Sequence, residues 1–412
     1  MSVAYFSGVR GRSSSAGGWL AGPVCGLAVA LLVTAVALPA RAQNFQSQAP
    51  FAFLLDSDSG AVLYEKAADE PMVPASMAKI ATALVAFQEI AAGRLSLDSE
   101  IGISENAWRK GGAPARGTTM FAIVHSRIRL SDILQGLIVQ AGNDAAIALA
   151  EAIAGDEATF ARVMTERVRA LGLTRSVFRN ATGMPDPEQR VTARELALLA
   201  NHIVRTYPDL YKIFGQREFT WNKIRQVNRN PLLTMEIGAD GLQTGDLDDS
   251  GYGLVGSAVE NGQRLIVVVN GLKTGRDRAS EARKLLEWGF RAFEKRQLFG
   301  DGEVVGEASV YGGEKSRIAL RTKGAVSLLL PRGTGERLSA RIVYQGPLNV
   351  PVQEGAPVAQ LIVSRGEVKT LAVPLYAAET VKAGSLQGRA LDALLELSTG
   401  WVRQALARIT RS

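Results

Sequence analysis

Residues 73–85 constrain the fold most strongly, because they combine an apolar, alanine-rich run with one serine and one lysine. Their sequence is Val73-Pro74-Ala75-Ser76-Met77-Ala78-Lys79-Ile80-Ala81-Thr82-Ala83-Leu84-Val85. Proline is favoured just before or at the start of a helix, and the residues that follow favour helix. A helix that is apolar on most sides must be enclosed by other elements, so the run predicts a buried helix.

The spacing of Ser76 and Lys79 suggests chemistry, because residues three apart lie on one face of a helix. A serine beside an amine at a helix N-terminus has a base to take its proton and backbone N–H groups that favour negative charge. Ser76 is the only serine in the chain with a lysine three residues later. The pair indicates a nucleophile and its base; the alternative is a helix cap followed by a solvent-facing lysine.

The N-terminus is predicted to be a secretory signal peptide. Arg10 and Arg12 precede an uncharged apolar run at 19–38, which ends at the small-x-small sequence Pro39-Ala40-Arg41-Ala42. Such a sequence is typical of a signal peptide cleaved after Ala42. A retained membrane anchor is the alternative, because the run is near the shortest length that spans a bilayer.

Cysteine usage and charge limit the compartment and the partners. The only cysteine, Cys25, lies in the predicted signal peptide, so the mature chain would contain none. Export without disulfides suits a bacterial periplasm or cell surface. Removing the three arginines of the signal lowers the net charge from +7 to about +4. This mild excess, without a basic cluster, gives no support for nucleic-acid binding.

The region from residue 43 to residue 299 is predicted to be an α+β domain with an antiparallel sheet, because strands and helices alternate in blocks. A hairpin is expected at 51–55 and 61–64, where two apolar runs flank a turn rich in Asp, Ser and Gly. Further helices are expected at 130–154 with a break near Gly142, and at 157–171, 192–205 and 279–293. Further strands are expected at 217–221, 253–259 and 265–270.

The last part of the chain changes character twice. Short alternating apolar runs spaced by Gly and Pro predict a small all-β domain at 300–381. An amphipathic, basic helix is predicted at 382–412, which is typical of a helix lying on a membrane surface. The alternative is a helix that docks on the β domain. The expected division is therefore signal peptide 1–42, catalytic domain 43–299, β domain 300–381 and membrane-associating helix 382–412.

Three motifs in this order resemble those of penicillin-binding proteins and serine β-lactamases: Ser76-x-x-Lys79, the Gly142-Asn143 turn and the Thr244-Gly245 strand. The closest likeness is to the D-alanyl-D-alanine carboxypeptidase branch of low-molecular-mass penicillin-binding proteins. It extends over nearly the whole mature chain, including the hairpin, the segments Gln140–Asp144, Gly183–Pro187 and Asp240–Gly256, the β domain and the tail. The resemblance implies a three-layer sandwich of sheet and helices.

The resemblance also implies roles for individual residues. Ser76 would be the acylated nucleophile and Lys79 its general base, while Asn143 would orient Lys79 and hold the substrate amide. Backbone N–H groups at Ser76 and on the late strand would form the oxyanion hole. Substrate-binding positions carried over are Ala141, Gln243, Thr244, Gly245 and Arg278. The implied partners are peptidoglycan stem peptides, β-lactam antibiotics as covalent inhibitors, and the inner-membrane surface for the tail of a periplasmic protein.

Three departures from the family pattern bear on rate. The second motif usually has serine where this chain has Ala141, so a hydroxyl that helps move protons is lost. The third usually has lysine where this chain has Gln243, which removes a cation that lowers the pKa of the first lysine. Asp246 stands where the family often has histidine. It would repel a substrate carboxylate unless something pairs with it, and Arg278 is a candidate for that pairing.

A literal copy of the third motif, Lys273-Thr274-Gly275, is predicted not to be the functional one. It lies on the turn after the next strand, ahead of a long helix. The segment Gly241–Gly245 is instead followed by the Gly251–Ser257 strand, as the family pattern requires.

No cofactor is expected. His125 and His202 are the only histidines and lack metal-ligand spacing, so a metal site is not expected. No glycine-rich phosphate loop follows a strand.

Three functions fit these observations. The first is an exported serine-type D-Ala-D-Ala carboxypeptidase that trims peptidoglycan stem peptides through an acyl-enzyme. The second is a cell-wall-binding or scaffolding protein whose site is weakened by Ala141 and Gln243. A β-lactamase is the third, and it is disfavoured by the additional β domain and the tail.

Overall fold

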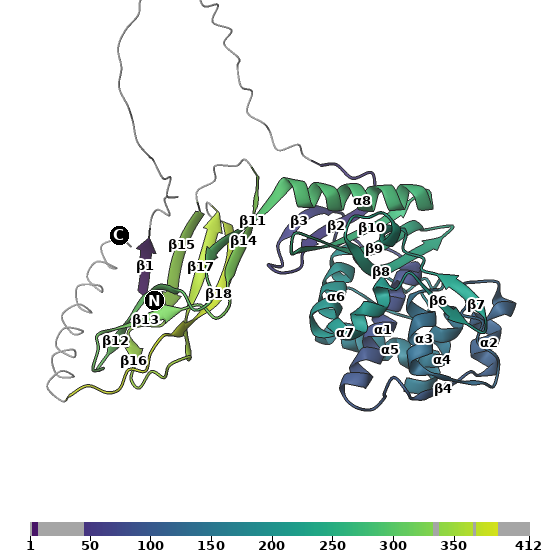
Figure 1. The fold of residues 1–412 in the computed structure, drawn as a ribbon, viewed down its shortest axis with the longest axis horizontal. Coiled ribbons are helices and arrows are strands. Elements are labelled where there is room, and N and C mark those ends of the chain that lie inside the picture. Colours follow the sequence, from purple (N-terminus) through teal and green to yellow (C-terminus); the bar gives the residue numbers. More distant parts are fainter. Residues whose placement is uncertain (1, 7–44, 333–337, 366–367, 386–412) are drawn as a thin grey trace, which may run out of the picture. The chain divides into compact units, whose positions relative to one another are not determined.

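The computed structural model describes residues 2–6, 45–332, 338–365 and 368–385. The chain forms two compact units, Asn44–Glu294 and a second made of Met1–Gln43 and Lys295–Ser412 (Figure 1). This division falls earlier than the expected boundary at residue 299. Most of the predicted signal peptide, and the predicted amphipathic tail beyond residue 385, lie outside the described residues.

An antiparallel five-stranded sheet forms the middle of the larger unit, with the strand order β3-β2-β10-β9-β8. Its strands are β2 (Phe51–Asp56), β3 (Val62–Lys66), β8 (Ala239–Leu247), β9 (Gly251–Glu260) and β10 (Gln263–Leu272). The predicted N-terminal hairpin is confirmed as β2 and β3. Strand β8 forms one edge of the sheet, so only one of its sides is paired with another strand of the sheet.

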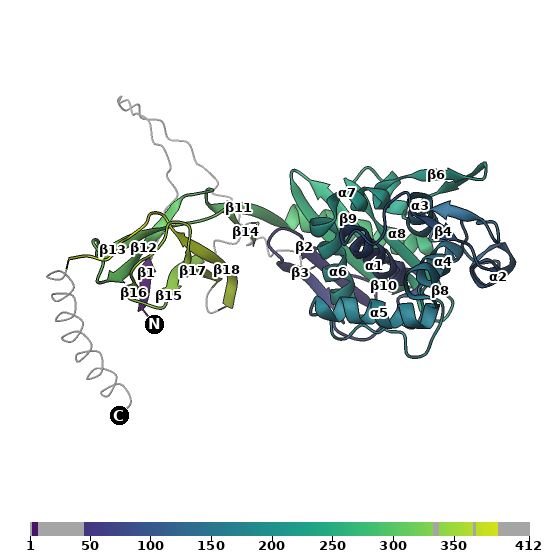
Figure 2. The same cartoon turned by 90° about the horizontal axis from the view of Figure 1, so that it is seen from below.

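Alternation along β10 shows why the unit has three layers. Leu265, Val267 and Val269 lie in a core that also contains Leu285 and Leu286 of α8 (Gly275–Ala292). The intervening Ile266 and Val268 belong to the larger core on the opposite face. Because successive side chains of a strand point to opposite faces, β10 is buried on both sides. Figure 1 shows α8 on one face of the sheet and the remaining helices on the other, and Figure 2 views the same layers from the side of those helices.

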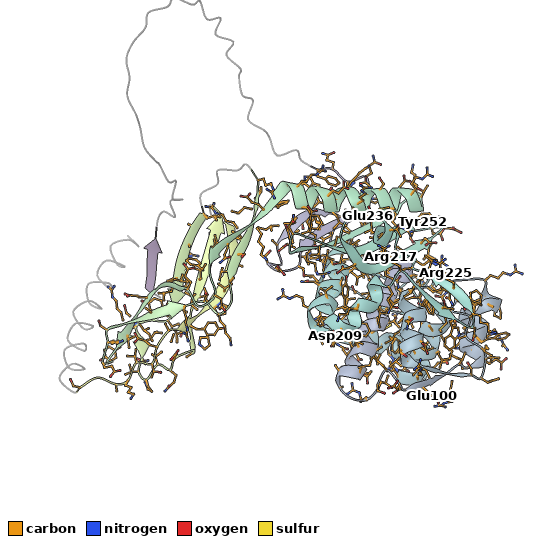
Figure 3. The ribbon with its side chains drawn as sticks, viewed as in Figure 1. Glu100, Asp209, Arg217, Arg225, Glu236 and Tyr252 are labelled. Atoms are coloured by element: carbon orange, nitrogen blue, oxygen red, sulfur yellow. The ribbon has the colours of Figure 1, made fainter. Side chains whose placement is uncertain are left out.

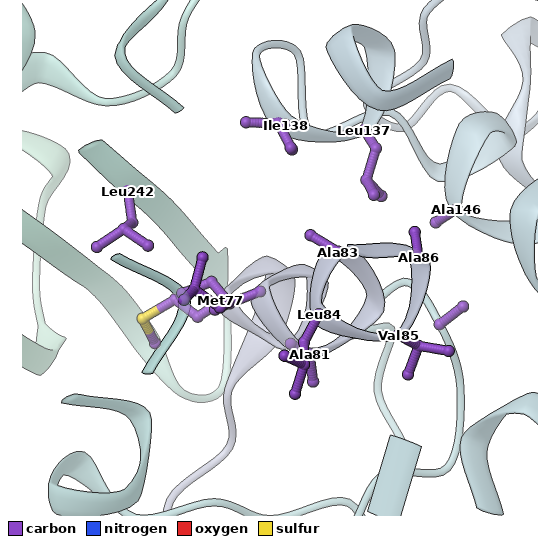
Figure 4. Packing of buried hydrophobic residues seen from close by; sticks show 14 of the residues in the cluster. Met77, Ala81, Ala83, Leu84, Val85, Ala86, Leu137, Ile138, Ala146 and Leu242 are labelled. Atoms are coloured by element: carbon purple, nitrogen blue, oxygen red, sulfur yellow. The ribbon is translucent and has the colours of Figure 1, made fainter. Parts of the chain in front are cut away.

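The opposite layer is a group of helices around α1 (Lys79–Ala91), which follows a short 3-10 turn, η1 (Ala75–Ala78). All residues from 77 to 87 are buried, as the sequence predicted. Figure 4 shows α1 with Leu242 on one side and Leu137 and Ile138 on another. The surrounding helices are α2 (Glu105–Gly111), α3 (Leu130–Ile138), α4 (Asn143–Ala154), α5 (Glu157–Ala170), α6 (Ala193–Thr206) and α7 (Pro208–Tyr211).

Small elements complete this unit. The 3-10 turns are η2 (Ala113–Ala115), η3 (Lys212–Gly215) and η4 (Pro231–Thr234). Two antiparallel pairs of short strands are β4 (Glu100–Gly102) with β5 (Arg127–Arg129), which are joined through α2 and η2, and the hairpin of β6 (Glu218–Trp221) with β7 (Ile224–Val227). Strand β7 was not predicted, because an exposed four-residue strand carries little hydrophobic pattern.

The second unit is all-β in its described part, as predicted. Its strands are β1 (Ser2–Phe6), β11 (Phe293–Phe299), β12 (Val304–Tyr311), β13 (Arg317–Arg321), β14 (Val326–Pro331), β15 (Leu338–Tyr344), β16 (Leu348–Asn349), β17 (Pro357–Arg365) and β18 (Val368–Ala377). The sheet order is β1-β15-β17-β18-β13-β12-β16, and β11 pairs with β14. A core of its own includes Ile318, Leu320, Leu361 and Leu375.

The pairing of β11 explains the earlier division of the chain. The helix was expected to end at Phe293 and the first domain at residue 299, but residues 293–299 form a strand that pairs with β14. Among the helices of the described residues, none has the length and apolar character needed to cross a bilayer.

Candidate active site

Ser76 and Lys79 meet where η1 leads into α1. The Lys79 Nζ atom donates to Ser76 Oγ at 3.0 Å and to the Thr182 carbonyl oxygen at 2.6 Å. The sequence predicted the first contact from helical spacing. The second fixes the end of the lysine side chain beside the hydroxyl and could not be read from the sequence. The alternative of a solvent-facing lysine is excluded, because Lys79 is 0% exposed.

Burial controls the charge of Lys79. Desolvation lowers the pKa of Lys79 from the usual 10.5 to about 7, although the charges of Asp144 and Glu157 oppose this change. The charge of Arg229 adds to the lowering. A lysine with a pKa near 7 is partly neutral at neutral pH, and only the neutral amine can accept a proton.

Two glycines enclose the backbone at Ser76. A Cβ added to Gly183 would overlap the Ala75 carbonyl, and one added to Gly245 would lie 2.8 Å from Pro74 O and 3.0 Å from Ser76 N. Gly183 also has a φ of +82°, which side chains with a Cβ rarely adopt. The 183 turn and strand β8 therefore pack directly against the nucleophile from two directions.

The link between α3 and α4 carries Ala141 and Asn143. Asn143 Nδ2 lies 4.0 Å from Met184 Sδ, next to the Gly183 turn that packs on Ala75. Ala141 has a φ of +59°, and its carbonyl accepts from Thr118 Oγ1 at 2.7 Å. The Asn143 N–H donates to Thr118 O at 2.8 Å. The Asn143 Oδ1 atom is buried and accepts no hydrogen bond within the described residues. A buried amide oxygen without a partner is costly, so Asn143 is ready to accept from a bound group.

Two carboxylates support this arrangement and were not predicted. Asp144 is 0% exposed and accepts from the Met120 and Ala122 N–H groups, which ties residues 120–122 to α4. Glu157 accepts from the Ala181 N–H at 3.1 Å, next to the carbonyl that holds Lys79. Burial raises the pKa of Glu157. The sequence gives no sign of either contact, because each joins segments that are distant along the chain.

Gln243 faces the end of α3. It is 0% exposed, and its Nε2 atom donates to Ile138 O at 3.2 Å and Leu137 O at 3.4 Å. Carbonyl groups at a helix C-terminus lack partners within the helix, so this amide satisfies them. The next residue on β8, Thr244, is 5% exposed. The third motif therefore contacts Ser76 through the backbone at Gly245, whereas the Gln243 amide donates to the C-terminal carbonyls of α3.

Arg278 and Asp246 form an ion pair, as the sequence suggested. The Arg278 Nη1 atom lies 3.7 Å from Asp246 Oδ1, and the two side chains are 11% and 63% exposed. The guanidinium lies over the Tyr252 ring, 5.6 Å from its centroid. Burial lowers the pKa of Arg278.

The literal Lys273-Thr274-Gly275 copy of the third motif has a structural role at the start of α8. The Thr274 hydroxyl caps α8 by accepting from the Asp277 N–H at 3.1 Å. Lys273 is exposed at the end of β10. These residues begin a helix, as the sequence predicted, whereas Gly245 packs on Ser76.

The site as a whole is suited to acyl transfer. It offers a hydroxyl bonded to a buried amine of lowered pKa, an amide oxygen ready to accept, and an edge strand beside the nucleophile. These are the parts of a serine acyl-transfer site in which lysine replaces histidine as base.

Comparison with known proteins defines the family. The family model described as D-alanyl-D-alanine carboxypeptidase matches residues 38–274, and the penicillin-binding protein 5 C-terminal domain matches residues 293–383. The D-alanyl-D-alanine carboxypeptidase DacC of Escherichia coli (strain K12) is 37% identical over 351 residues, covering 84% of this chain and 88% of the relative. The chain therefore belongs to the D-alanyl-D-alanine carboxypeptidase family, whose members are serine hydrolases.

Solved structures agree with this assignment. Penicillin-binding protein 5 from Haemophilus influenzae has a TM-score of 0.75 and 32% identity, covering 82% of this chain and 98% of that chain. Penicillin-binding protein D2 from Listeria monocytogenes, solved in an ampicillin-bound form, has a TM-score of 0.54 and 27% identity, covering 60% and 99%. The predicted fold class is confirmed, except for the C-terminal helix, which lies outside the described residues.

Proposed function

We propose that this chain removes the terminal D-alanine from peptidoglycan stem peptides through an acyl-enzyme at Ser76. The observation that carries the proposal is the 3.0 Å contact between Ser76 Oγ and the fully buried Nζ of Lys79. Membership in the carboxypeptidase family supports the same reaction.

The chemistry follows from this contact. Neutral Lys79 accepts the hydroxyl proton as Ser76 Oγ attacks the carbonyl carbon of the last peptide bond. The carbonyl oxygen becomes negative and is stabilised by backbone N–H groups at Ser76 and on β8. The proton passes to the nitrogen of the leaving D-alanine as the peptide bond breaks. Water then attacks the ester, Ser76 regains its proton, and the shortened peptide leaves.

Recognition of the peptide uses the surroundings of Ser76. Because β8 is an edge strand, an extended peptide can pair with its outer side beside Thr244 and Gly245. We expect Asn143 Oδ1, which is buried and accepts no hydrogen bond within the described residues, to accept from a substrate amide. We expect the Arg278 guanidinium to bind a terminal carboxylate, as the family resemblance implies. We propose that β-lactams acylate the same serine, in line with the relative that was solved with ampicillin.

The proposal places the enzyme in the periplasm after cleavage of residues 1–42. The catalytic domain then extends from 43 to 294, where the β domain begins, and residues 382–412 associate with the inner membrane. The net basic charge of that tail supports attraction to anionic lipids.

Release of D-alanine from a pentapeptide tests the function. The purified mature chain is expected to release it, Ser76→Ala to be inactive, and Ser96→Ala, an exposed serine on a turn, to match the unaltered protein. An unaltered protein that releases no D-alanine, or a Ser76→Ala variant that still does, contradicts the proposal.

The second candidate is a penicillin-binding scaffold with slow turnover. One observation favours it: Gln243 donates to the carbonyls of α3 and carries no charge near the site, and Ala141 has no hydroxyl. This candidate predicts acylation of Ser76 by penicillin without measurable release of D-alanine. A pentapeptide turnover number of 1 per second or faster, within the usual range for enzymes of about 1–1000 per second, would contradict it.

A further inference from the structure

We propose that Asp246 is a specificity-determining residue, whose carboxylate competes with the terminal carboxylate of the substrate for Arg278. The inference rests on the proposed function, because it concerns the same site. It predicts that a negative charge on the leaving group raises kcat/KM less in this chain than it would with a neutral residue at position 246.

The backbone brings the three participants together. Asp246 of β8 pairs in register with Tyr252 of β9, so their side chains point to the same face of the sheet. Arg278, in the first turn of α8, lies over the Tyr252 ring. Figure 3 shows Tyr252 beside the N-terminal end of α8. Three elements thus converge on one charged cluster next to Gly245, which itself packs on Ser76.

The Arg278 guanidinium is positioned over the Tyr252 ring, but not all of its N–H donors have a hydrogen-bond partner. Its Nε and Nη1 atoms are buried and donate no hydrogen bond within the described residues. The 3.7 Å separation from Asp246 Oδ1 gives an ion pair that is too long for a hydrogen bond. Arg278 therefore has two buried donors without a partner, and a guanidinium binds a carboxylate that reaches it through two parallel hydrogen bonds.

A second carboxylate at Arg278 would also face Asp246. Two like charges beside one cation repel each other, so part of the attraction to Arg278 is lost while Asp246 stays in place. Asp246 is 63% exposed, which leaves it solvated and limits the size of this effect. The structure thus points to a moderate, charge-specific penalty rather than to a blocked site.

A matched pair of acyl donors isolates this penalty. An N-acyl-D-alanyl thioglycolate carries a carboxylate on its leaving group, and its methyl ester does not. Acylation of the full mature chain by each would be followed through thiol release for the unaltered protein, Asp246→Asn and Asp248→Asn. Asp248 is an exposed acid on the turn after β8, so its variant makes the same change in charge.

The expected result in Asp246→Asn is an increase of about two- to fivefold in kcat/KM for the thioglycolate relative to the methyl ester, within the range for an ion pair with an exposed partner. The charge of Asp246 also raises the pKa of Lys79, so any effect of Asp246→Asn on the base is shared by both donors, and the ratio of kcat/KM for thioglycolate to methyl ester isolates the effect at Arg278. That ratio should rise in Asp246→Asn and stay unchanged in Asp248→Asn. Equal effects on both donors, no effect, or a loss with the thioglycolate would overturn the inference while leaving the proposed function intact. Failure of every protein to react with either donor would contradict the proposed function as well.

Discussion

The Ser76–Lys79 corner and the Asp246–Arg278 corner of the site differ in how tightly the protein controls them. Lys79 is 0% exposed and is held by a hydroxyl and a carbonyl at 3.0 and 2.6 Å. Asp246 is 63% exposed, and its partner Arg278 is 3.7 Å away with unused donors. One corner is dry and fully bonded, whereas the other is partly wet and loosely paired.

This difference indicates which positions of the site can tolerate substitution. A lysine base needs a low pKa, which burial supplies, so any change that admits water at Lys79 acts directly on the chemistry. A cation attracts a carboxylate over several ångströms, so the Asp246–Arg278 corner can bind a carboxylate even when the residues beside Arg278 differ. This contrast accounts for an unchanged Ser76–Lys79 pair beside the departure at the exposed Asp246.

Replacing Lys79 by methionine should have the largest effect. Methionine fills a similar volume but cannot accept a proton, so acylation by penicillin should fall by about 10³-fold, the middle of the usual range for a general base. Stopped-flow acylation rates check this, with Lys212→Met as a control at an exposed lysine. A rate within tenfold of the unaltered protein would mean that Lys79 is not the base.

Replacing Gly183 by alanine should have the second-largest effect, because it disturbs the packing around Ser76 and lowers the free energy of unfolding. Its new methyl group would overlap the Ala75 carbonyl, whereas a Cβ at Gly60, with a similar φ of +72°, meets nothing within 4 Å. Gly60→Ala should lower the free energy of unfolding by about 1 kcal/mol. Gly183→Ala should lower it by roughly 3 kcal/mol more. Urea denaturation measures both, and equal losses would refute tight packing at Ser76.

The pH dependence of acylation should reflect Lys79. Because its pKa is lowered to about 7 and the neutral form is the active one, the rate should rise with pH through a midpoint near 7. Between pH 6 and pH 8 the neutral fraction rises roughly tenfold. Acylation rates across this range measure the midpoint. One above pH 9 would show that Lys79 keeps an ordinary pKa and that its burial is not what prepares the base.

Restoring the usual motif residues should have the smallest effect. Ala141→Ser combined with Gln243→Lys should raise pentapeptide turnover by roughly three- to tenfold, because the hydroxyl and the ammonium aid proton transfer to the leaving amine. Gln243→Lys alone should lower stability, since it buries an ammonium at a fully buried position. If the double variant gains nothing, the departures at 141 and 243 are not what limits the rate.

Much of the fold followed from local patterns in the sequence. The hairpin at 51–66, the break between α3 and α4, and the buried helix after Ser76 each have a periodicity or turn signature. The choice of residues 243–245 over 273–275 depended on the order of the following strands. The structure agrees, since Gly245 packs on Ser76 and Thr274 caps α8.

Contacts between distant segments could not be predicted. The carbonyl of Thr182 that holds Lys79, the Glu157 carboxylate behind it, and the engagement of Gln243 with α3 depend on how helices and loops pack. Strand β11 was missed because an exposed strand at the end of a helix has no clear pattern of its own. The roles of the site residues remain predictions that the variants above would test.

Mass spectrometry of the purified mature protein with and without penicillin tests the central claim most directly. We expect a mass increase equal to one intact penicillin, located after digestion on the peptide that contains Ser76 and absent from Ser76→Ala. An unmodified protein, or an adduct on any other residue, would contradict it.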